Sequence, residues 1–214
     1  MDSLLLPLQP LFAAAFTLWG APVTWLEAVA FVLALAMVVL NIRVNPLAWP
    51  LAIVSSLLYV ALFWNHRLYG DASLQVFFAL VAAWGWWQWL RGTDAAGHAL
   101  RVRSLGTEGR LSVLVAIALA WPATALFLRR FTDTDVPWWD AFPTAASFVG
   151  QWLLGRKYVE NWVVWIVVDV VAAALFAYKG LWPTALLYAV FVAMAAVGWR
   201  RWRADAAAHA GAAP

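Results

Sequence analysis

The feature that most constrains this chain is a series of long apolar stretches. A helix needs about 20 apolar residues to cross a hydrocarbon core about 30 Å thick, and stretches close to that length recur along the 214 residues with short polar breaks. They are apolar on every face, which excludes the alternating pattern of transmembrane β-strands. The sequence therefore predicts an all-α integral membrane protein with seven spans, at residues 24–41, 47–65, 72–90, 111–128, 141–154, 159–178 and 183–202.

The composition agrees and excludes several classes of function. Hydrophobic residues make up 65% of the chain and charged residues 12%, whereas a soluble domain has about 45–50% and about 25%. The formal charge of +3 is too diffuse to indicate nucleic-acid binding. The chain lacks cysteine, its three histidines fall in predicted loops or the tail, and it has no Walker-type glycine loop. We therefore expect no enzymatic activity, no cofactor and no metal.

An internal repeat determines the predicted architecture. Residues 25–89 align without a gap with residues 138–202, and a chance match of Leu-, Ala- and Val-rich sequence would not align tryptophans, a glycine and an arginine. Each copy holds three helices, and the single span between them restores the direction of entry, so the copies are parallel. The expected fold is a 3+1+3 bundle. Matched pairs include Trp25/Trp138, Arg43/Arg156, Trp49/Trp162, Gly85/Gly198, Trp86/Trp199 and Trp89/Trp202.

The remaining segments complete the predicted organisation. Residues 4–19 are apolar but contain two prolines and no basic flank, which favours a short interfacial helix over a signal peptide. The predicted parts are an N-terminal segment (1–22), a first repeat (23–90), a loop and linking helix (91–130), a second repeat (131–203) and a tail (204–214).

The basic residues predict the orientation. Four of the 14 lie on the side of the N-terminus and the other ten lie on the opposite side, so the C-terminus is expected to be cytoplasmic and the N-terminus outside. The four are Arg67, Arg129, Arg130 and Lys179, and the ten are Arg43, Arg91, Arg101, Arg103, Arg110, Arg156, Lys157, Arg200, Arg201 and Arg203.

The sixth span carries the most informative polar stripe. At about 100° per residue, Asn161, Trp162, Trp165 and Asp169 lie within about 100° of one another. A carboxylate beside two indoles suits a flat cationic ring, held by charge attraction and cation–π contact. The structural alternative is that Trp162 marks a membrane interface and that Asp169 hydrogen-bonds a neighbouring helix.

Other spans offer further candidates for a substrate site. Polar and aromatic residues at helical spacing face one side of the second, third, fifth and seventh spans, and the polar ones gather in the second copy, which predicts an asymmetric site. The structural alternative is helix packing, in which small polar residues allow close approach. The candidates are Ser56, Tyr59, Gln75, Thr144, Ser147, Gln151 and Tyr188.

Several of these segments resemble the Pnu-type bacterial vitamin transporters. The similarity lies in HRLYGDASLQVFF, AWGWWQW, and above all WWDAFPTAASFVGQWLLGRKYVENWVVWIVVD, and it covers residues 25–202. It implies a SWEET-like fold in the inner membrane, facilitated diffusion, and coupling to a cytosolic kinase that phosphorylates the arriving vitamin. It also implies that Asn161, Trp162 and Trp165 belong to the substrate region.

The substrate stays open at this point. The best-known members of the family carry nicotinamide riboside, and others carry thiamine or riboflavin. Asp169 suits the positively charged nicotinamide riboside and thiamine and argues weakly against neutral riboflavin. A membrane scaffold or channel subunit without a carried substrate is the alternative outside transport. Membrane lipid is an expected partner and nucleic acid is not, while the sequence leaves open whether the protein is a monomer or a homo-oligomer.

Overall fold

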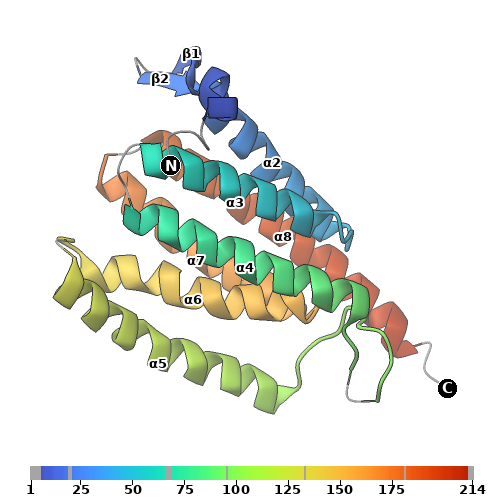
Figure 1. The fold of residues 1–214 in the computed structure, drawn as a ribbon. Helices are drawn as coiled ribbons and strands as arrows, with labels where there is room; N and C mark the ends of the chain where they lie inside the picture. Colours follow the sequence, from blue (N-terminus) through green and yellow to red (C-terminus); the bar gives the residue numbers. More distant parts are fainter. Residues whose placement is uncertain are drawn as a thin grey trace. The chain divides into compact units, whose positions relative to one another are not determined.

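Long helices form almost all of the structure, a computed structural model that describes residues 6–18, 21–65, 69–94, 96–132, 134–180 and 182–211 (Figure 1). Each predicted span corresponds to one long helix, with ends that differ by a few residues at most places. The helices are α2 (Trp25–Ile42), α3 (Ala48–Asn65), α4 (Tyr69–Arg91), α5 (Thr107–Phe131), α6 (Pro137–Gly155), α7 (Glu160–Tyr178) and α8 (Trp182–Gly211).

The N-terminal segment differs from the expected interfacial helix. It forms only a short 3-10 helix, η1 (Leu6–Phe12), followed by an antiparallel hairpin of β1 (Ala14–Leu18) and β2 (Ala21–Thr24). Pro10 lies inside η1 and has no amide hydrogen, which limits how far a helix can extend there. Residues 1–5, where the predicted helix begins, lie outside the described residues.

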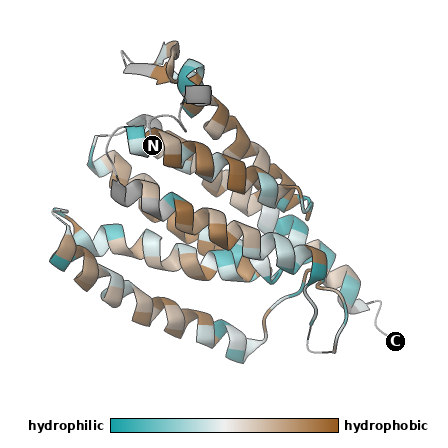
Figure 2. Ribbon diagram, in the orientation of Figure 1, coloured by the Kyte–Doolittle hydropathy of each residue, from teal (hydrophilic) through white to brown (hydrophobic). Residues whose placement is uncertain are grey.

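Five of the helices are long and apolar enough to cross a membrane. They are α2, α3, α5, α7 and residues Thr184–His209 of α8. The other two, α4 and α6, are long enough but contain Gln75 and Gln88 or Asp140 and Gln151. Figure 2 shows the apolar character along α5, with hydrophilic residues near its ends. The chain is therefore a multi-pass membrane protein.

The C-terminal helix extends further than the sequence indicates. We expect a tail from residue 204, but α8 continues to Gly211, through the arginine-rich segment that follows Trp199. Alanine dominates the added turns, and alanine has the highest helix propensity of all residues.

The chain divides into two compact units, Met1–Trp87 and Gln88–Pro214. In the first unit α2 packs against α3, and the Ser55 hydroxyl donates to the Ala30 carbonyl at 3.0 Å. In the second unit α5 packs against α6, α6 against α7, and α7 against α8. The core of the second unit is formed by Ala146, Leu153, Val164 and Val168.

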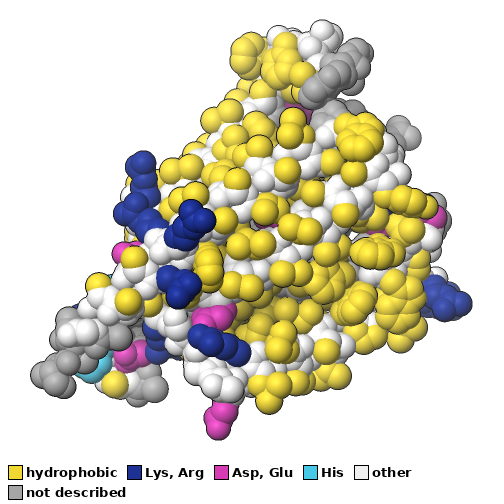
Figure 3. Space-filling view, turned by 180° about the vertical axis from the view of Figure 1, so that it is seen from behind, with side chains coloured by type: hydrophobic (Ala, Val, Ile, Leu, Met, Phe, Trp, Pro, Cys, Tyr) yellow, Lys and Arg dark blue, Asp and Glu magenta, His cyan; other side chains and the backbone are white. Residues whose placement is uncertain are grey.

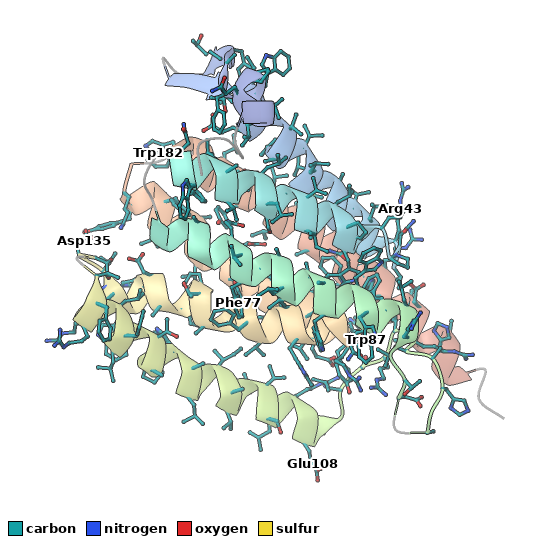
Figure 4. All side chains as sticks on the ribbon, viewed as in Figure 1. Arg43, Phe77, Trp87, Glu108, Asp135 and Trp182 are labelled. Atoms are coloured by element: carbon teal, nitrogen blue, oxygen red, sulfur yellow. The ribbon has the colours of Figure 1, made fainter. Side chains whose placement is uncertain are left out.

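The turns within the two repeats have the same backbone structure. The α2–α3 turn, marked by Arg43 in Figure 4, places Val44 at φ 54°, and the α6–α7 turn places the equivalent Lys157 at φ 58°. In both, the next residue donates its N–H over 2.9 Å to the carbonyl five residues back, as Asn45 to Leu40 and Tyr158 to Leu153. Two non-glycine residues in the left-handed region at matched positions support the internal duplication.

A second equivalence lies between helices. Gly198 of α8 faces the ring of Trp162 on α7, and a Cβ atom added to this glycine would lie 2.6 Å from the ring. The matched residue Gly85 of α4 faces the ring of Trp49 on α3 in the same way. We call each of these contacts a glycine notch. Both tryptophans are almost fully buried, so each repeat uses a missing side chain to seat a large ring.

The loop between α4 and α5 docks against the α6–α7 turn. The Arg103 N–H donates to the Lys157 carbonyl at 3.1 Å, and the Val159 N–H donates to the Arg103 carbonyl at 3.0 Å. The neighbouring Val102 is buried. We call residues 100–105 the strap. A segment expected to be a plain polar loop is therefore fixed to the second repeat.

Candidate functional site

The predicted polar stripe lies on the buried side of α7. Asn161 is 0% exposed and Asp169 is 7% exposed, whereas Val163, Val167 and Val170 are exposed on the other side of the helix. This follows from the helical period, which separates the two groups of residues around the axis. The sequence pattern thus correctly identified which side of this helix faces the protein interior.

Two polar atoms at the start of the stripe have no hydrogen-bond partner within the described part of the chain. The Asn161 amide nitrogen donates to the Tyr158 carbonyl at 2.6 Å, but its Oδ1 accepts nothing, and neither does the Trp162 Nε1–H donate. Buried polar atoms in native proteins almost always have a partner. A buried acceptor and a buried donor therefore lie without partners at the same end of α7.

The two indoles of the stripe differ in their surroundings. Trp162 is held in the glycine notch of Gly198 and meets the Trp202 ring edge-on, with centroids 5.6 Å apart. Packing alone accounts for the position of its ring. Trp165 is half-buried and packs on Gly150 of α6, where an added Cβ would lie 3.3 Å from the indole. Trp165 is thus the less buried of the two indoles.

Asp169 is a buried carboxylate two turns further along the stripe. No ion pair to it occurs among the residues that the structure describes. A charge within the membrane is costly and is usually kept for function or for pairing with another group. Its match in the first repeat, Ser56, is also buried and carries no charge. The two repeats therefore differ at this position, as expected for an asymmetric site.

The candidates on α6 and α8 lie in the same unit as the stripe. Thr144, Ser147 and Gln151 are half-buried, and the Thr144 hydroxyl donates to the Asp140 carbonyl at 3.1 Å within its own helix. Tyr188 of α8 stacks on Phe176 of α7, with centroids 5.2 Å apart. Ser147 and Gln151 belong to the same helix as Gly150, on which Trp165 packs.

The remaining three candidates belong to the first unit. Ser56 is buried on α3, and Gln75 is half-buried on α4. Tyr59 packs against the apolar cluster that includes Leu26 and stacks on Phe63 at 5.8 Å. The surroundings of Tyr59 are those of a packing residue.

The sequence interpretation missed the role of the residues just before the stripe. Glu160 accepts a hydrogen bond from the Leu105 N–H at 3.0 Å and pairs with Arg110 at 3.2 Å. The Tyr158 hydroxyl accepts from Arg103 at 3.0 Å. These side chains hold the strap and the start of α5. Their only signal in the sequence is the charged segment RKYVE, which follows an apolar helix. Nothing in the sequence indicates that this segment pairs with the polar loop before α5.

Lys157 takes part in the same anchorage. Its Nζ donates to the Leu100 carbonyl at 3.0 Å and lies 5.1 Å from the centroid of the Trp89 ring. Burial lowers the pKa of the Lys157 ammonium group. The strap side of the second unit thus contains a partly buried cation that is already used in structural contacts.

The long apolar helices are those of a multi-pass membrane protein, and α7 of the second unit carries a buried polar stripe. A family model described as nicotinamide mononucleotide transporter matches residues 24–204. The chain belongs to this family, which confirms the resemblance to Pnu-type transporters and the expectation of a transporter rather than an enzyme.

Individual proteins agree with the family match. The chain is 31% identical over 190 residues to the riboflavin/roseoflavin transporter RibM of Streptomyces davaonensis, covering 88% of this chain and 89% of RibM. It is 25% identical over 207 residues to the nicotinamide riboside transporter PnuC of Escherichia coli, covering 86% and 87%. The crystal structure of the vitamin B3 transporter PnuC has the same fold, with a TM-score of 0.70, 22% identity and coverage of 86% and 83%.

Proposed function

We propose that this protein is an inner-membrane facilitator for a B-type vitamin, with nicotinamide riboside as the first candidate. The observation that carries the proposal is the stripe on α7, where a buried carboxylate, a half-buried indole and an amide oxygen without a partner lie on one side of a helix. Together they supply charge attraction, ring stacking and hydrogen bonding, which a pyridinium riboside would use at once.

Riboflavin is the second candidate. RibM is the relative with 31% identity, against 25% for the PnuC of Escherichia coli. The flat isoalloxazine ring would use the same indole but carries no fixed positive charge, so Asp169 favours the pyridinium. Thiamine is cationic as well and belongs in the same test.

We also propose the 3+1+3 SWEET-like arrangement of seven spans, with the N-terminus outside and the C-terminus in the cytoplasm. Support comes from the matched left-handed residues Val44 and Lys157 and from the two glycine notches. In this arrangement α5 is the linking helix between the repeats. The orientation is supported by the excess of arginine and lysine at the ends of the helices near the strap and at the end of α8.

Transport is expected to be passive. The chain has no nucleotide-binding motif, and no group of three potential metal ligands occurs within the described residues. Purified protein in liposomes should therefore equilibrate labelled nicotinamide riboside without ATP, sodium or proton gradients. Net uptake in cells would then need a kinase that traps the vitamin by phosphorylation. Accumulation above the outside concentration that disappears when an ion gradient is dissipated would contradict this prediction.

A melting-temperature screen of the purified protein tests the proposed substrate. Nicotinamide riboside, riboflavin and thiamine are each added at increasing concentration. A ligand at about 100 times its dissociation constant stabilises the folded state by about 2.7 kcal/mol, which is readily measured. Stabilisation by nicotinamide riboside alone supports the first candidate, and stabilisation by riboflavin alone supports the second. A protein that responds to none of them and shows no saturable uptake favours the scaffold alternative.

The substitution Asp169→Asn separates charge from shape. If the carboxylate attracts a cationic ring, the affinity for nicotinamide riboside should fall about tenfold or more, since an ion pair within a bundle contributes more than an exposed one. The affinity for the reduced, neutral riboside should not change. Calorimetric titration of both ligands measures this difference. An equal loss for both ligands, or a fall in melting temperature without ligand, would indicate a structural role for Asp169.

A further inference from the structure

The second unit has a groove of about 610 Å³ that is separate from the polar stripe. One wall comes from α5 and the other from α7, and the walls are almost entirely apolar. The wall residues are Val113, Leu114 and Ile117 of α5 and Val163, Val164 and Val167 of α7.

The groove opens on the outer surface of the unit. Val163 and Val167 are 43% and 44% exposed, and Leu114 is 64% exposed. Val163 and Val167 lie on the side of α7 that faces away from Asn161 and Trp165. In a membrane protein, exposed aliphatic side chains of this kind contact lipid. The groove therefore is not part of the proposed vitamin site.

Charged side chains lie at one end of the groove. Glu160 pairs with Arg110 at 3.2 Å, so these two charges balance. Arg203 lies over the Trp199 ring at 4.8 Å and forms no ion pair within the ranges that the structure describes. Figure 3 shows a face of the molecule on which acidic and basic side chains lie beside a wide hydrophobic area. The end of the groove thus carries one uncompensated positive charge.

The dimensions match one leaflet of a bilayer. Val159 and Val167 both line the groove, and eight residues of helix cover about 12 Å. Half of a hydrocarbon core of about 30 Å is about 15 Å. The groove therefore extends from a charged end at the membrane surface to a depth close to that of a single acyl-chain layer.

We propose that the groove between α5 and α7 binds a phospholipid with an anionic head group, taken from the leaflet on the strap side. Arg203 holds the phosphate region, and an acyl chain lies between Leu114 and Val167. Basic pockets between transmembrane helices have this type of ligand. The apolar walls alone would also suit a second copy of the chain, but the unpaired arginine at the end favours the anionic lipid.

A single reporter can test this because the natural chain has no cysteine. Leu114→Cys carries a fluorophore in the groove, and Leu126→Cys carries it on the same helix, at an exposed residue that does not line the groove. Both proteins are reconstituted with phosphatidylglycerol or phosphatidylcholine whose acyl chains are brominated, and quenching of the fluorophore is measured. Arg203→Gln and the matched Arg201→Gln, which is exposed on α8 outside the groove lining, are added to each reporter.

At Leu114, phosphatidylglycerol should quench at about a fivefold lower mole fraction than phosphatidylcholine, which corresponds to about 1 kcal/mol for one arginine at an anionic surface. Arg203→Gln should remove the preference, and Arg201→Gln should leave it unchanged. At Leu126 the two lipids should quench equally. Val167→Trp, which fills the groove, should lower quenching at Leu114 by both lipids.

Two results would overturn the proposal. Equal quenching by both lipids at Leu114 would show that the head group is not recognised. Protection of Leu114 from both lipids, together with disulfide-linked dimers of unlabelled Leu114→Cys, would show that a second copy covers the groove.

Discussion

Gly198→Ala should cause a large loss of stability. The added methyl group would lie 2.6 Å from the Trp162 ring, a distance at which one of the two must move. The ring is rigid and only 3% exposed, so it has no space into which to retreat. Overpacking of a filled core costs about 1–3 kcal/mol and occasionally more. Chemical denaturation in detergent micelles, followed by tryptophan fluorescence, measures the loss.

The same helix provides the control. Gly211 has no atom within 4 Å of an added Cβ, so Gly211→Ala should leave stability unchanged or raise it slightly. Gly85→Ala should behave like Gly198→Ala, because it meets the Trp49 ring in the first glycine notch. If Gly198→Ala is as stable as the wild-type protein, the close contact between α7 and α8 is not present in the membrane.

Trp165→Ala should weaken vitamin binding by about 1–3 kcal/mol, the range measured when a stacked aromatic is removed from beneath a base. The ring is half-buried, packs on Gly150 and lies on the same side of α7 as Asp169. Folding should survive, since the substitution leaves the rest of the core in place. Calorimetric titration with nicotinamide riboside, or with the vitamin that the melting screen identifies, measures the change.

An exposed tryptophan serves as the matched variant. Trp139 of α6 is 60% exposed, and Trp139→Ala should leave the affinity unaltered. Unchanged affinity in a stably folded Trp165→Ala protein would mean that this indole supports the helix packing and that the vitamin binds elsewhere.

The helices could be predicted from the sequence because each one is a long apolar run, a local property. The hairpin before α2 could not, since Phe16 and Val23 pair through backbone groups without an alternating pattern to mark the strands. The strap was missed for a similar reason. Its bonds to Lys157 and Val159 join segments more than 50 residues apart, and its polar, glycine-rich surroundings are typical of an ordinary loop.

The stripe on α7 was predicted correctly as a buried face because one helical period determines it. The helical period does not indicate which residues of neighbouring helices each side chain contacts. The helical period places Trp162 and Trp165 on one stripe, yet one ring fits a glycine notch and the other packs on α6 and is less buried. The sequence likewise did not indicate that Tyr59 packs against an apolar cluster. The assignment of individual residues to the vitamin site therefore stays a prediction.

The two repeats have equivalent turns, but only the second turn has the groups that bond to the strap. Val159 donates its N–H to the strap and Glu160 accepts from it, whereas the matched residues of the first repeat are Pro46 and Leu47. Proline has no amide hydrogen and the leucine side chain has no acceptor, so the first turn lacks both of these contacts. The two matched segments are thus not interchangeable: with their order exchanged, the linker would be followed by a turn that lacks these two contacts.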